Sequence, residues 1–265
     1  CAAPWAAGVI GYAERLMDLP LGVVGVAFGT VLLPTFAGLF AKKDESGARE
    51  ALGSSLTSLS FVMIPAAVGL FVLAGEVTAV IYEGGEFDAT ATVRVSRALA
   101  VYSVGLGFFS LQKVMVPWFQ AQGDMKTPLK VSLFTVAVNA ALNVLAVWLL
   151  PVEWRHVGLS ASTVFCSAVG CLMLVMLARR RNGNLGFSKI AVPMVKIFSA
   201  SAVMCIVIYL SRAFIVSDGG LLPVKLNGVL QLTVLIALGT AAYFAASVLF
   251  MRKELKNFRI RRRRA

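Results

Sequence analysis

Long apolar segments separated by short polar connections run through almost the whole chain. They cover residues 19–41, 56–80, 98–121, 129–150, 157–178, 190–210 and 229–251. Each is close to the length of about 20 residues that crosses the hydrocarbon core as a helix. None alternates apolar and polar residues as a membrane β-strand does. The pattern therefore predicts an all-α integral membrane protein with about seven transmembrane helices.

The amino-acid composition excludes a soluble globular protein. Of the 265 residues, 58% are hydrophobic and 14% are charged, whereas charged residues make up about 25% of an average soluble domain. A soluble fold of this composition has too little polar surface to cover its apolar side chains.

Lysine and arginine residues predict which side of the membrane each connection faces. One set of alternate connections is much the richer in them, and by the positive-inside rule it faces the cytoplasm. Its basic residues are Lys42, Lys43, Arg49, Lys126, Lys130, Arg179, Arg180, Arg181, Lys189 and those from Arg252 to Arg264. The C-terminus is therefore expected in the cytoplasm. The basic tail directly follows a span, so attraction to anionic lipid explains it better than binding to nucleic acid.

Proline and glycine interrupt several apolar segments, among them Pro20, Pro65, Gly69 and Gly105. Such residues free backbone groups or remove side chains, so two explanations stay open. The helices either lie beside a cavity where those groups are satisfied, or pack closely through small residues.

Neither a metal centre nor a catalytic constellation is indicated. The four cysteines show no paired spacing and His156 is the single histidine, so a metal site is not expected. We also find no phosphate-binding glycine loop or triad spacing, and expect a protein that is not an enzyme and needs no cofactor. The chain begins with Cys1 and has no basic region before its first apolar segment, which predicts a piece of a longer protein.

Charges beside or within the spans are the best pointers to function, because a charge in hydrocarbon costs about 2.5 to 3.5 kcal/mol. In a helix, Glu14 and Asp18 lie on one face with Arg15 between them. The guanidinium could face a cavity and bind an anionic group such as a pyrophosphate. Alternatively, the cluster only anchors the helix end at the interface.

Two further groups of polar residues lie inside spans. Lys113 lies in the middle of an apolar run, without a carboxylate within four residues, which favours a cavity-facing lysine. Asn139 and Asn143 share one helix face, and Thr163 begins the next span. Their oxygens could coordinate a cation such as sodium, or the same residues could form hydrogen bonds between helices.

Three stretches carry a resemblance to a known family. They are YAERLMDLPLGVVGVAFGTVLLPTF at residues 12–36, IYEGGEFDATAT at residues 81–92 and FQAQGDMKTPLKVS at residues 119–132. On these motifs the chain resembles the MurJ/MviN family of lipid II flippases, which belongs to the multidrug and polysaccharide exporter superfamily. Three matches in the same order across more than a hundred residues are fairly specific for the family, whereas a single match would be weak.

The resemblance implies a fold of two six-helix lobes around a central cavity, with two extra helices at the C-terminus. Residues 1–180 would be part of the second lobe, and residues 181–251 the extra helices, which form an apolar groove for a lipid tail. Residues 252–265 would be a basic cytoplasmic tail. The N-terminal lobe is missing, so this part alone should not flip lipid.

The resemblance also implies a cargo, undecaprenyl pyrophosphate carrying the peptidoglycan disaccharide-pentapeptide. It is moved to the outer leaflet of the bacterial plasma membrane by alternating access. Arg15 matches a cavity arginine that meets the pyrophosphate, with Glu14 and Asp18 at the family's acidic positions. Asn139 and Asn143 lie where some members bind sodium, but aspartate can occupy the second position there, so coupling to sodium or protons stays open.

Three other functions remain to be weighed. Within transport, these are a drug or sodium antiporter and an exporter of another lipid-linked glycan. Outside transport, the chain could be a membrane scaffold that packs against a cell-wall or division partner. The charges placed inside spans argue against the scaffold.

Overall fold

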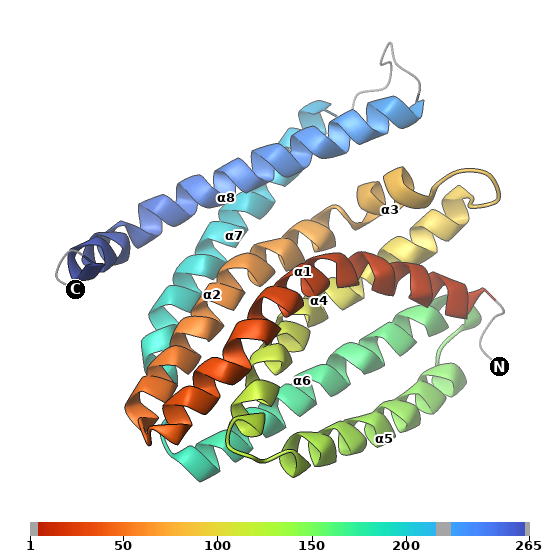
Figure 1. Cartoon of the computed structure of the whole chain (residues 1–265). Helices are drawn as coiled ribbons and strands as arrows, with labels where there is room; N and C mark the ends of the chain where they lie inside the picture. Colours follow the sequence, from red (N-terminus) through yellow and green to blue (C-terminus); the bar gives the residue numbers. More distant parts are fainter. Residues whose placement is uncertain (1–4, 216–223, 263–265) are drawn as a thin grey trace.

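The computed structural model describes the backbone of residues 5–215 and 224–262, and these residues are almost entirely helical (Figure 1). The elements are α1 (Ala6–Ala41), α2 (Glu45–Val72), α3 (Ala74–Tyr82), α4 (Ala89–Gln120), α5 (Lys126–Leu149), the 3-10 helix η1 (Val152–Trp154), α6 (Arg155–Asn182), α7 (Phe187–Ile215) and α8 (Val224–Arg262). Among the described residues, seven helices are long and apolar enough to cross a membrane. The predicted helical membrane fold is confirmed.

Several helix boundaries differ from the apolar segments, and two of them lie near the residues discussed below. Helix α1 begins at Ala6, well before the apolar segment at residue 19, because charged residues lower the hydropathy without breaking the helix. The span predicted for residues 56–80 is present as α2, but it ends at Val72, and α3 begins after Leu73. Apolar residues lie on both sides of Leu73, so hydropathy carries no sign of this interruption.

The backbone groups around Leu73 stay paired. Its N–H donates to the carbonyl of Gly69 at 2.9 Å, and its own carbonyl accepts from the N–H of Val77 at 2.8 Å. The interruption is therefore compatible with an apolar surrounding, where an unpaired backbone group costs several kcal/mol.

Helices α1, α2, α4 and α6 enclose the main apolar core, and α5 lies against α6 (Figure 1). The large side chains of Trp118, Tyr102 and Phe36 are fully buried there. Helix α7 packs against α2, and α8 packs against α7. A second, smaller apolar cluster, which includes Met204, Ile208 and Leu235, joins these last two helices.

The prolines and glycines lie in two different settings. Pro20, Pro65 and Gly69 line an apolar pocket. Gly105, in contrast, lies where α4 and α6 pack closely: a Cβ atom there would lie 2.6 Å from Cγ2 of Val164. The prolines lie inside helices rather than at their ends.

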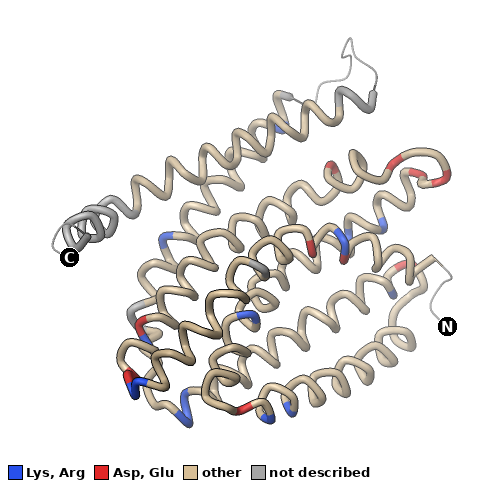
Figure 2. The backbone as a smooth tube through the Cα atoms, in the orientation of Figure 1, with Lys and Arg blue, Asp and Glu red and all other residues tan. Residues whose placement is uncertain are grey.

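Charged residues gather toward the two ends of the helices and are sparse along their middles (Figure 2). The turn between α3 and α4 carries Glu83, Glu86 and Asp88, and we call this end the predicted outer end. The opposite end, with Lys42 and Arg181, is the predicted cytoplasmic end. The side chains of the basic tail, 252–265, lie outside the described residues.

Candidate functional site

Arg15 lies on an exposed face of α1, one turn after Tyr12. Its Cζ atom is 5.9 Å from the centroid of the Tyr12 ring, near the limit of a cation–π contact. Among the described residues, no carboxylate oxygen lies within 4.0 Å of its guanidinium nitrogens. Arg15 therefore forms no ion pair with any of the described residues.

The two predicted acidic neighbours of Arg15 behave differently from one another. Glu14 is half-buried, and its Oε1 accepts a hydrogen bond of 2.9 Å from the hydroxyl of Tyr102 on α4. Asp18 is exposed. Glu14 therefore fastens α1 to α4. Sequence reasoning missed Tyr102, because it lies 88 residues away and only helix packing brings it to Glu14.

Lys113 does not lie with Arg15. Its side chain is exposed on α4 and extends to Gly25 of α1. A Cβ atom built on Gly25 would lie 4.0 Å from Cε of Lys113. Ten residues of helix separate Gly25 from Arg15, a rise of about 15 Å. Arg15 and Lys113 therefore both lie along α1, but they are too far apart to bind one small anion together.

Asn139, Asn143 and Thr163 do come together between α5 and α6. Nδ2 of Asn143 donates to Oδ1 of Asn139 at 2.9 Å, and Nδ2 of Asn139 lies 3.5 Å from Oγ1 of Thr163. Oδ1 of Asn143 is buried, with no hydrogen-bond partner among the described residues. The cluster thus combines hydrogen bonding between helices with one spare oxygen.

An apolar pocket of about 420 Å³ opens between α1, α2, α3, α7 and α8. Its lining includes Leu16, Leu19, Pro65, Met204, Gly239 and Tyr243. Leu19 lies one turn beyond Arg15 on α1. A single helix therefore supplies both Arg15 and part of the pocket wall.

An ion pair ties α7 to α3 at the predicted outer end. Nη2 of Arg212 is 2.7 Å from Oε1 of Glu76, and both residues lie about one turn from pocket-lining residues of their own helices. Sequence reasoning missed this pair, because Glu76 lies inside the apolar segment of residues 56–80 and far along the chain from Arg212.

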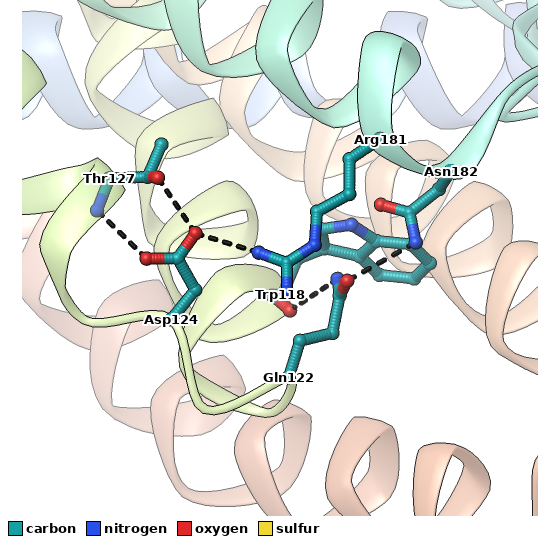
Figure 3. Close-up of polar contacts among 6 residues, drawn as sticks. All are labelled: Trp118, Gln122, Asp124, Thr127, Arg181 and Asn182. Carbon is teal, nitrogen blue, oxygen red and sulfur yellow. Dashed lines mark hydrogen bonds and ion pairs between the residues drawn. The ribbon is translucent and has the colours of Figure 1, made fainter.

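A polar clamp joins the turn after α4 to the end of α6 at the predicted cytoplasmic end (Figure 3). Nη1 of Arg181 donates to Oδ2 of Asp124 at 2.7 Å, and Thr127 donates to the same carboxylate through Oγ1 at 2.7 Å and through its N–H at 2.9 Å. Nδ2 of Asn182 donates to Oε1 of Gln122 at 3.2 Å. The Thr127 hydrogen bonds, with a smaller effect of Arg181, lower the pKa of Asp124.

The sequence matches the family model described as "Lipid II flippase MurJ" over residues 2–230. The chain belongs to this family. A Rhizobium tropici relative, "Probable lipid II flippase MurJ", is 34% identical over 247 residues, which cover 92% of this chain and 45% of the relative. The "Lipid II flippase MurJ" of Burkholderia cenocepacia is 34% identical over 172 residues, covering 65% of this chain and 33% of the relative.

The MurJ fold is also seen in a solved structure. "Lipid II flippase MurJ, inward closed conformation" matches with a TM-score of 0.71 and 22% sequence identity, covering 94% of this chain and 48% of that chain. The chain thus spans about half the length of that structure and, in the Rhizobium tropici case, 45% of the relative. This coverage agrees with the expectation that it corresponds to one half of the two-lobe fold.

Proposed function

We propose that this chain forms the second lobe of a flippase that carries a lipid-linked peptidoglycan precursor to the outer leaflet for cell wall synthesis. The cargo is undecaprenyl pyrophosphate bearing the muropeptide. One observation carries the proposal: Arg15 has no carboxylate partner within the described residues, and Leu16 and Leu19 of the same helix line the apolar pocket. One ligand with an anionic head and a long apolar chain can contact both.

The charge of Arg15 favours an anionic cargo. Arg15 belongs to a helix that is apolar enough to span the membrane, and exposing its charge to hydrocarbon would cost about 2.5 to 3.5 kcal/mol. A cavity with water or an anion avoids that cost. A pyrophosphate suits this position because guanidinium donates two parallel hydrogen bonds to phosphate oxygens.

The pocket suits part of a polyprenyl tail. Its volume of about 420 Å³ is within the range of small-molecule sites, and its lining is almost wholly apolar. A tail gains little free energy by leaving lipid for another apolar surrounding. The pocket therefore fixes the position of the tail relative to Arg15 more than it adds to affinity.

The lobe is built to move as a unit. Glu14 joins α1 to α4, Nε2 of Gln112 on α4 donates to the carbonyl oxygen of Ser167 on α6 at 2.9 Å, and the clamp at Asp124 joins α4 to α6 at their other end. These contacts support alternating access by rocking of whole lobes, without covalent chemistry.

The remaining assignments are part of the same proposal. Residues 1–180 belong to the lobe, residues 181–251 contain the two additional helices at the pocket, and the tail from residue 252 faces the cytoplasm of the bacterial plasma membrane. Another part of the transporter supplies the first lobe. Lys113 contributes positive charge to the cavity deeper than Arg15, and the cluster of Asn139, Asn143 and Thr163 is the place where a coupling sodium ion would bind.

The test is transport by the complete protein that contains this chain, reconstituted in vesicles with a fluorescent lipid-linked precursor. We expect Arg15→Ala to weaken precursor binding about tenfold to hundredfold, the range for a charge-assisted hydrogen bond, and to abolish delivery to the outer leaflet. Arg15→Lys should retain part of the activity. Arg49→Ala is the matched control, because Arg49 forms an exposed ion pair with Glu45 far from the pocket.

Other results would assign other functions. Normal flipping by Arg15→Ala would remove the proposed role of Arg15. Binding of organic cations instead of the precursor would indicate an antiporter, and equal transport of unrelated lipid-linked glycans would indicate another cargo. A stable protein partner, with no effect of Arg15 or Lys113 substitutions on any cargo, would indicate a scaffold.

A further inference from the structure

Three aromatic rings pack together at the predicted outer end, beside Arg15. We call Tyr12, Tyr82 and Phe87 the outer aromatic cluster. The ring centroids of Tyr12 and Tyr82 are 4.8 Å apart, those of Tyr12 and Phe87 are 5.4 Å apart, and those of Tyr82 and Phe87 are 5.8 Å apart. Tyr12 nevertheless remains 37% exposed, so part of its ring is open to a ligand.

The turn after α3 is built to hold Phe87 in this cluster. Gly84 and Phe87 exchange two backbone hydrogen bonds of 3.2 Å, and Gly85 has the positive φ of 62° that closes such a tight turn. Asp88 then caps α4 by accepting a hydrogen bond of 2.7 Å from the N–H of Ala91. The turn belongs to the IYEGGEFDATAT motif, which takes part in neither the proposed pyrophosphate site nor the tail pocket.

The guanidinium of Arg15 lies beside this cluster but is not tightly stacked on it. Its Cζ is 5.9 Å from the Tyr12 ring centroid, whereas the Cζ atoms of Arg94 and Arg97 lie 4.0 and 4.8 Å from their tryptophan rings. Arg94 and Arg97 are therefore held by aromatic neighbours, while Arg15, with a longer ring contact and no ion pair among the described residues, can turn toward an anion. Tyr12 and Arg15 together present an aromatic ring next to a cation.

Three chemically different groups follow one another along α1. Tyr12 is aromatic and lies toward the predicted outer end, Arg15 is cationic, and Leu19 lines the apolar pocket. Seven residues of helix separate Tyr12 from Leu19, a length of about 10 Å. A glycosyl pyrophosphate on an apolar chain has sugar, phosphate and chain in the same order.

We propose that the outer aromatic cluster binds the sugar that is attached directly to the pyrophosphate of the cargo. This inference rests on the proposed function, in which Arg15 binds the pyrophosphate. One face of a pyranose ring carries mainly C–H groups and packs against an aromatic face, while a tyrosine hydroxyl is at hand for its polar edge. Because Tyr12 is on the outer side of Arg15, the site fits cargo whose sugar points outward and whose tail lies in the membrane.

The test compares two ligands on the complete transporter: undecaprenyl pyrophosphate, and the same lipid carrying the disaccharide without the peptide. We expect Tyr12→Leu to weaken binding of the disaccharide ligand about threefold to tenfold, the range for one aromatic contact, and to leave the bare pyrophosphate within about twofold. Tyr12→Phe should keep the preference for the sugar. Phe87→Leu should also lower the preference for the disaccharide ligand, because Phe87 packs against the Tyr12 ring.

Tyr209→Leu is the matched control, since Tyr209 is an exposed tyrosine of α7 that does not line the pocket. It should change the affinity of neither ligand. The inference is overturned if Tyr12→Leu and Phe87→Leu, in folded protein, leave the ratio of the two affinities at the wild-type value. If only one of these two variants folds, the same criterion applies to that variant alone. Arg15→Ala separates the two proposals, because loss of both ligands upholds the pyrophosphate site whatever happens to the sugar preference.

Discussion

Two glycines on α4 allow the packing of the lobe to be tested by a matched pair of substitutions. A Cβ atom at Gly105 would lie 2.6 Å from Cγ2 of Val164 and 2.8 Å from Cε2 of Phe109, distances that force a neighbour to move. A Cβ atom at Gly107 would meet no atom within 4 Å. Replacing glycine by alanine should therefore overpack the structure at Gly105, whereas Gly107 has room for the extra methyl group.

The magnitude follows from these contacts. Alanine is favoured over glycine in a helix by about 0.5 to 1 kcal/mol, and this gain is common to both variants. Overpacking costs about 1 to 3 kcal/mol, and Val164 is β-branched, so it cannot rotate away easily. We expect Gly107→Ala to be as stable as the wild type or slightly more stable, and Gly105→Ala to be less stable than Gly107→Ala by about 1 to 3 kcal/mol.

The measurement is the free energy of unfolding of the complete protein in detergent, titrated with denaturant. The difference between the two variants is the informative quantity, because effects of the detergent on helix propensity cancel in it. Equal stability of Gly105→Ala and Gly107→Ala would refute the conclusion that α4 and α6 pack closely through Gly105.

Three further predictions concern polar contacts. Asp124→Asn should lower stability by about 0.2 to 1 kcal/mol at neutral pH, because it removes the charge that pairs with Arg181. Since the pKa of Asp124 is lowered in the folded state, the wild-type advantage should be present above about pH 4 and fade as the pH falls further. Glu76→Ala and Arg212→Ala should be non-additive by at least about 0.5 kcal/mol in a double-mutant cycle of unfolding. Transport that depends on sodium in the wild type should lose that dependence in Asn143→Leu, measured with sodium replaced by potassium.

The sequence was sufficient for the membrane helices because hydropathy sums over many residues. It was not sufficient for the interruption at Leu73, where apolar residues continue on both sides. It also missed the early start of α1 at Ala6, since Arg15 lowers the local hydropathy although it lies inside the helix. Hydropathy indicates which segments can lie in the lipid bilayer, whereas helix boundaries depend on backbone geometry.

Pairs within one helix could be foreseen, as could the approach of Asn139 to Thr163 on the next helix, whereas pairs between helices distant in the sequence could not. Asn139 and Asn143 were predicted to share a face, and their hydrogen bond follows from the helical spacing. The hydrogen bond from Tyr102 to Glu14 spans 88 residues. Such a contact depends on which helices pack together and at what rotation, and a single sequence contains no direct record of either.

The partners of each arginine, rather than its position in the sequence, distinguish Arg15 from the other cations near the predicted outer end. Arg94 and Arg97 stack on tryptophan rings at 4.0 and 4.8 Å, and Arg212 forms an ion pair of 2.7 Å. Within the described residues Arg15 has only the 5.9 Å approach to a tyrosine ring. A charge that the protein itself does not compensate must be stabilised by water or by a ligand. A transport defect in an Arg94 or Arg97 variant as severe as that of Arg15→Ala, with the fold intact, would show that this reasoning about partners selects the wrong residue.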